Sequence, residues 1–119
     1  MERLKVMKWS ELKSPQQVDQ ILEESKEKAV LIFKHSSRCS VSRMALDRLE
    51  RNWNESEMGH LKPYFLDLIN YRDTSNHIAH QFQVEHESPQ VLIIEKGAAI
   101  YDESHMGIDY RAIRDALKN

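Results

Sequence analysis

The sequence predicts an α/β domain built on a central mixed sheet of four to five strands, with helices on both faces. Short apolar runs rich in branched residues alternate along the chain with segments of helical periodicity. The chain has 119 residues, which is the size of one domain, so we expect residues 1–119 to share a single fold unit.

The first expected helix follows a capping sequence. Ser14 is predicted as its N-cap, Pro15 stands in its first turn, and Gln17 can return the capping bond. Helical spacing of apolar residues continues to about residue 28. A short strand over residues 5–9 would supply the fifth strand of the sheet.

The next two segments place the single cysteine of the chain. Residues 29–33 form an apolar run without polar alternation, which is typical of a central strand covered on both faces. Helical spacing predicts a helix over about residues 40–57. Its apolar side is expected to comprise Val41, Met44, Ala45, Leu49 and Trp53. Cys39 therefore lies between a buried strand and a helix N-terminus.

The second half of the chain predicts a strand, a helix, a hairpin and a final helix. A strand over residues 63–69 is followed by a polar stretch and a helix that carries Phe82. Strands over residues 89–95 and 98–102 are joined by a two-residue turn, which makes them antiparallel. The last helix is expected to start near Asp109.

Charge and hydropathy exclude several function classes. The 17 Lys and Arg residues against 19 Asp and Glu give a net charge of −2, which offers no general attraction to nucleic acid or an acidic membrane. No apolar run approaches the ~20 residues of a membrane span, and the N-terminus has no apolar signal core. We expect a cytoplasmic protein.

The counts of cysteine and histidine bear on metal and redox chemistry. Cys39 is the only cysteine, which excludes an internal disulfide, a CxxC pair and a multi-cysteine zinc site. His77 and His80 could share a helix face, with His86 and Glu87 beyond them. Spacing of this kind is common on solvated helices, so no metal site is predicted.

Two motifs together resemble a known family. The strand-to-helix junction reads Phe33-Lys34-His35-Ser36-Ser37-Arg38-Cys39-Ser40-Val41-Ser42, and a later segment reads His86-Glu87-Ser88-Pro89-Gln90. They resemble the monothiol bacilliredoxins, which are thioredoxin-like proteins of the bacillithiol redox system. The resemblance implies a thioredoxin-like fold in which Pro89 is a cis-proline that faces Cys39. The residue after the cysteine is often proline in that family and is Ser40 here, which affects the tuning of the thiol.

The resemblance also implies a function, that of a monothiol thiol–disulfide oxidoreductase in redox homeostasis under oxidative stress. The Cys39 thiolate would attack a protein mixed disulfide and carry bacillithiol transiently. No tightly bound cofactor is expected, and bacillithiol is the thiol co-substrate. The expected partners are bacillithiolated proteins and a low-molecular-weight thiol, with no nucleic acid and no membrane. We expect a monomer.

Five residues around the sulfur receive roles. A helix N-terminus favours an anion, and Arg38 adds positive charge beside the Cys39 thiol. Ser42 occupies the position of the second cysteine in CxxC, from which its hydroxyl can reach the sulfur. Cys39, Ser42 and Arg38 are the predicted catalytic residues. Ser40 and Val41, whose amides should point toward the sulfur, are assigned to substrate binding.

A second wall of the site is expected from the later motif. Ser88 and Pro89 should bind substrate, because the residue before the cis-proline of this fold pairs with an extended segment through main-chain hydrogen bonds. Lys34, near the end of the buried strand, is expected to add positive charge near the thiol.

Two other function classes stay open. Monothiol glutaredoxins share the Cys-x-x-Ser arrangement and can hold an iron–sulfur cluster between subunits, although this loop lacks their Gly-Phe pair. A non-catalytic thioredoxin-fold interaction module, in which Cys39 is incidental, is the other alternative. Cys39 taken by itself could also be a buried structural thiol.

Overall fold

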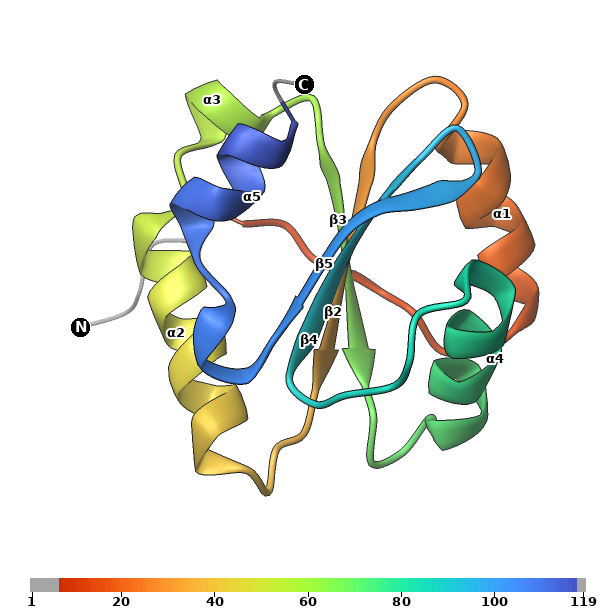
Figure 1. Ribbon diagram of the computed structural model, residues 1–119, viewed down its shortest axis with the longest axis horizontal. Coiled ribbons are helices and arrows are strands. Elements are labelled where there is room, and N and C mark those ends of the chain that lie inside the picture. Colours follow the sequence, from red (N-terminus) through yellow and green to blue (C-terminus); the bar gives the residue numbers. More distant parts are fainter. Residues whose placement is uncertain (1–6, 118–119) are drawn as a thin grey trace.

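The computed structural model describes residues 7–117, in which a five-stranded mixed sheet separates two layers of helices (Figure 1). The strands are β1 (Ser10–Glu11), β2 (Val30–His35), β3 (Lys62–Asp67), β4 (Gln90–Glu95) and β5 (Ala98–Ser104). They lie in the order β1-β3-β2-β4-β5. β3 is parallel to both β1 and β2, whereas β4 is antiparallel to β2 and to β5. The predicted mixed sheet and the β4–β5 hairpin are confirmed.

Helices cover both faces of the sheet, as predicted. They are α1 (Gln16–Glu24), α2 (Ser40–Asn52), α3 (Glu55–Met58), α4 (Arg72–Phe82) and α5 (Tyr110–Ala116), with a 3-10 turn η1 (His105–Gly107). α1 and α4 lie on one face, and α2, α3 and α5 lie on the other (Figure 1). None of the helices described for residues 7–117 is both long and apolar enough to cross a membrane.

All six residues of β2 are buried, because the strand lies in the middle of the sheet with helices on both sides. Leu31 and Phe33 belong to the core under α2 and α5, and Ile32 belongs to the core under α1 and α4. This double coverage explains the lack of polar alternation in the sequence. The alternation of side chains continues through Lys34 and His35, which therefore point into opposite layers.

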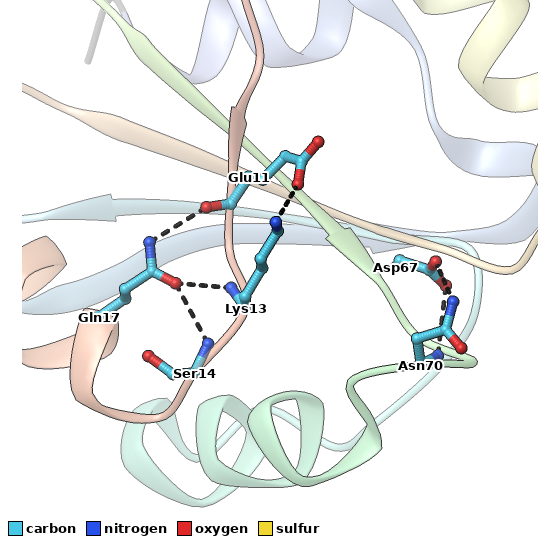
Figure 2. A network of polar contacts seen from close by, with 6 residues as sticks. All are labelled: Glu11, Lys13, Ser14, Gln17, Asp67 and Asn70. Carbon is cyan, nitrogen blue, oxygen red and sulfur yellow. Dashed lines mark hydrogen bonds and ion pairs between the residues drawn. The ribbon is translucent and has the colours of Figure 1, made fainter.

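The start of α1 differs from the sequence prediction. The N-cap position is held by Pro15 and has no side-chain cap, so the prediction that Ser14 is the N-cap was wrong. Gln17 does return a bond: its Oε1 accepts from the amides of Lys13 at 2.6 Å and Ser14 at 3.1 Å. Its Nε2 also donates to the Glu11 carbonyl at 3.1 Å, which ties α1 to β1 (Figure 2).

The helix expected over residues 40–57 is broken in two. α2 ends at Asn52, and Trp53 is extended and buried. Asn54 then starts α3, with its side chain accepting a hydrogen bond from the Ser56 amide at 3.0 Å. An asparagine that bonds the following backbone in this way competes with the helix and begins a new one.

Two further boundaries concern the ends of the sheet and the last helix. The edge strand is β1, at residues 10–11 rather than 5–9; residues 5 and 6 of that range lie outside the described residues. The predicted start of the last helix is confirmed, because the Asp109 side chain accepts from the Ala112 amide at 3.2 Å.

Replacement of the α3 cap should destabilise the fold. We expect Asn54→Ala to lower the free energy of unfolding by about 1 kcal/mol, because the Ser56 amide loses its acceptor. Urea denaturation followed by far-UV circular dichroism measures the change. Asn52→Ala, an exposed asparagine at the end of α2, is the matched control and should stay within about 0.5 kcal/mol of wild type. Equal stability of both variants would contradict the capping role.

Candidate active site

Cys39 occupies the N-cap of α2, close to the carboxyl end of β2, and its side chain is partly buried. Its amide donates to the Ser36 carbonyl at 3.1 Å, and its carbonyl accepts from the Arg43 amide at 3.1 Å. These bonds close a turn over Ser36 to Cys39 that presents the thiol at the start of the helix. Within residues 7–117 the sulfur accepts no capping hydrogen bond from the first turn.

Ser42 lies beneath this turn and is fully buried. Its Oγ accepts from the Ser36 amide at 3.0 Å and lies 2.7 Å from Nδ1 of His35. The hydroxyl is thus used to hold the loop, and in the described part of the chain it makes no hydrogen bond to Cys39. A direct role of Ser42 at the sulfur stays a prediction.

The orientation of α2 corrects one sequence prediction. Ser42, Ala45 and Leu49 form its buried face, whereas Met44 is 56% exposed. The prediction that Met44 lies on the core side was wrong. A polar residue takes the core position because its hydroxyl is satisfied there by the loop and by His35.

His35 is a site residue that the sequence reasoning did not identify. It ends β2, is buried, and pairs with Asp67 in the β2–β3 ladder. Burial lowers the pKa of His35, with the Asp67 carboxylate opposing that shift. The ring is therefore neutral at pH 7, and Nδ1 can share a proton with the Ser42 hydroxyl. Continuation of the strand's alternation past Phe33 was the signal that places residue 35 under the cysteine loop.

The remaining residues near the thiol are more exposed. Arg38 and Ser40, on either side of Cys39 in the chain, are exposed, and Val41 is partly buried. Arg43 donates from Nη1 to the Ser37 carbonyl at 2.8 Å, which ties the loop to the first turn of α2. Arg43 had no role in the sequence prediction.

Pro89 follows a cis peptide bond, as predicted. Gln90 pairs with Lys34 in the antiparallel β2–β4 ladder, so Pro89 lies beside the end of β2 from which the cysteine loop leaves. Both loops lie at the same end of the molecule, the lower end in Figure 1. The Pro89 carbonyl accepts from the His105 amide at 3.0 Å.

Ser88 carries free hydrogen-bonding groups at this end of the sheet. In residues 7–117, neither its amide nor its carbonyl has a backbone partner, and its Oγ is buried without one. Main-chain groups of this kind can pair with an extended segment of another chain.

Lys34 does not add charge at the thiol in the way that was expected. It is fully buried, on the face of the sheet opposite His35. Its Nζ lies 3.3 Å from the Ser75 carbonyl and 3.4 Å from Nδ1 of His86. Burial lowers the pKa of Lys34 to about 8. Among residues 7–117 there is no group of three or more His, Cys, Asp or Glu side chains placed to hold a metal ion.

Comparisons with known proteins agree with this fold. A family model described as monothiol bacilliredoxin BrxC matches residues 10–113. A solved structure described as a suspected oxidoreductase with a thioredoxin fold is 31% identical, with a TM-score of 0.77 over 90% of this chain and 91% of that one. Thioredoxins from Malassezia sympodialis and Trypanosoma brucei brucei are each 16% identical, with TM-scores of 0.71 and 0.70; they cover 99% of this chain and 95% of theirs. The thioredoxin-like fold is confirmed.

Removal of the Ser42 hydroxyl should destabilise the cysteine loop. We expect Ser42→Ala to lower the free energy of unfolding by about 1–3 kcal/mol, because the Ser36 amide and His35 lose their partner. Urea denaturation measures this. Ser37→Ala, in the same loop but exposed, should change it by less than about 0.5 kcal/mol. If both variants are as stable as wild type, the hydroxyl does not hold the loop.

Stability should fall on the acid side because of His35. The pKa of His35 is lower in the folded state than in the unfolded chain. At pH values between these two pKa values, the unfolded chain therefore binds more protons than the folded protein. The free energy of unfolding should therefore decrease as pH drops through about 6.5 and level off below the folded pKa. His86, also with a lowered pKa, acts in the same direction. His35→Gln should flatten part of this slope in denaturant titrations at several pH values; an unchanged slope would contradict the assignment.

Proposed function

Because the chain belongs to the monothiol bacilliredoxin family, we propose that it removes bacillithiol from protein mixed disulfides. The family and the fold support a redox function. The observation that carries this specific reaction is the partly exposed Cys39 thiol at the start of α2, in a chain with no second cysteine.

The first step transfers bacillithiol to the protein. The Cys39 thiolate, at the positive end of the α2 dipole, attacks the bacillithiol sulfur of the mixed disulfide. A new disulfide forms between Cys39 and bacillithiol while the bond to the client sulfur breaks. The electron pair leaves on the client thiolate, which is protonated from solvent. Arg38, exposed next to Cys39, supplies positive charge to the reacting sulfurs.

The second step must use a thiol from solution, because the chain holds no resolving cysteine. A free bacillithiol thiolate attacks the bacillithiol sulfur attached to Cys39 and forms bacillithiol disulfide. Cys39 leaves as the thiolate. In total one free bacillithiol is consumed and the disulfide bond is passed on: the client thiol is regenerated, and the bacillithiol removed from the client leaves joined to the second one as bacillithiol disulfide.

Client proteins would bind across the cysteine loop and the segment before Pro89. The amide and carbonyl of Ser88, which have no backbone partner among residues 7–117, support main-chain pairing with an extended client segment. Such pairing recognises backbone rather than sequence, which suits a protein that acts on many clients. Ser40 and Val41, in the first turn of α2, would complete the binding surface. We propose that the protein acts as a cytoplasmic monomer with bacillithiol as co-substrate and no resident cofactor.

Loss of the thiol should abolish the reaction. We expect Cys39→Ser to release no detectable bacillithiol from a bacillithiolated client, as measured by intact mass of the client over time. Wild type treated with bacillithiol disulfide should gain one bacillithiol adduct, located at Cys39, and should pass it to free bacillithiol. Wild type alkylated at Cys39 is the matched control and should be as inactive as the variant. Release by Cys39→Ser at the wild-type rate would overturn the proposal.

A further inference from the structure

A polar cluster, buried except for a partly exposed histidine, lies behind the Ser88-Pro89 segment, on the face of the sheet away from the cysteine loop. We call it the loop cluster, and it comprises Lys34, Ser75, His86 and Gln90. Lys34 and Gln90 are paired across β2 and β4, and both are at most 1% exposed. Ser75 lies in α4 and is also buried.

The loop cluster holds two successive residues of the segment that leads to Ser88. Gln90 donates from Nε2 to the Glu85 carbonyl at 2.9 Å. Nδ1 of His86 lies 3.4 Å from Nζ of Lys34 and 3.2 Å from Oγ of Ser75. Side chains from the rigid sheet and from α4 therefore set the position of the loop.

The stability of the fold does not explain why a lysine is buried at position 34. Lys34 forms no ion pair among residues 7–117, and burial is the only cause of its lowered pKa. The same face of β2 carries Val30 and Ile32, which are packed in an apolar core. An apolar side chain at position 34 would avoid the cost of burying an ammonium without a carboxylate. The buried charge thus points to a role beyond stability.

We infer that Lys34 is a positioning residue of the exchange reaction, which holds the loop that presents the Ser88 main chain to client proteins. It acts through Ser75 and His86 and does not touch the reacting sulfurs. The inference rests on the proposed function for its effect on clients, but the loop contact itself can be tested separately.

The contact depends on two charge states. Lys34 donates best as the ammonium, and His86 accepts at Nδ1 only while that nitrogen is unprotonated. Burial lowers the pKa of His86, as do the charges of Lys34 and Arg72, while Glu87 opposes them. The loop is therefore held best above the pKa of His86 and below the pKa of Lys34, which is about 8.

Lys34→Met tests the inference, because methionine keeps an unbranched chain but removes the donor. We expect the rate of bacillithiol release from a protein mixed disulfide to fall about tenfold, the loss that accompanies one weakened positioning contact. The rate of Cys39 alkylation by iodoacetamide should be unchanged, because it needs no client. The unfolding midpoint in urea should not fall at pH 7. Lys28→Met, an exposed lysine before β2, is the matched control and should behave as wild type.

Two substitutions at His86 test the same contact if Lys34→Met fails to fold. His86→Asn retains an acceptor near the position of Nδ1, whereas His86→Leu removes it. We expect release to fall with His86→Leu and to recover in large part with His86→Asn. In wild type, the ratio of release to alkylation should also decline as pH rises through about 8, and this decline should be absent in Lys34→Met.

Hydrogen exchange of the loop separates this inference from the proposed function. Amides of residues 84–88 should exchange faster in Lys34→Met and His86→Leu than in wild type, while the amides of β2 do not change. Faster loop exchange without release by wild type would refute the proposed function alone. The role of Lys34 would be overturned if Lys34→Met and His86→Leu both match wild type in two measurements: the exchange of the loop amides, and the ratio of bacillithiol release to Cys39 alkylation.

Discussion

The double pairing of β2 is the constraint on which the candidate active site depends. This strand is hydrogen-bonded to β3 on one side and to β4 on the other, and helices cover both of its faces. A shift of one residue would exchange its two faces and break both ladders. The ends of β2 and β4 are therefore fixed relative to each other. Cys39 follows one of them, and Pro89 precedes the other.

Side chains alternate between the two faces of β2, so the cysteine loop and the segment that carries Ser88 are supported by different residues of this strand. His35 points under the cysteine loop, and Lys34 points behind the segment that carries Ser88. Burial disfavours the charged form of both groups. The His35 ring is neutral at pH 7 because its pKa is lowered, whereas Lys34 is an ammonium because its pKa is still about 8. Both are polar groups at the edge of an apolar core, and each is held there by hydrogen-bonding partners on its own side of the sheet.

The sequence was sufficient to predict those features for which the local pattern and the fold agree. The buried strand, the hairpin, the cysteine at a helix start and the cis-proline were all predictable from short motifs together with the family resemblance. The break between Asn52 and Asn54 was not, because apolar spacing continued through it, whereas Trp53 is extended and the Asn54 side chain caps a new helix by accepting from the Ser56 amide. Burial of Ser42, exposure of Met44 and the partners of Lys34 depend on tertiary contacts that no local pattern reports.

The hydrogen bonds of Ser42 change the meaning of the missing second thiol. Its hydroxyl contacts both the Ser36 amide and the His35 ring. Position 42, where a resolving cysteine would stand, is therefore already occupied by a residue that holds the loop. A thiol there would be a weaker acceptor and donor than the hydroxyl. Conversion of this chain into a two-cysteine oxidoreductase would therefore require a new way to hold the turn, and not only a second sulfur. The packing of the loop itself thus fits the external thiol that the proposed reaction requires.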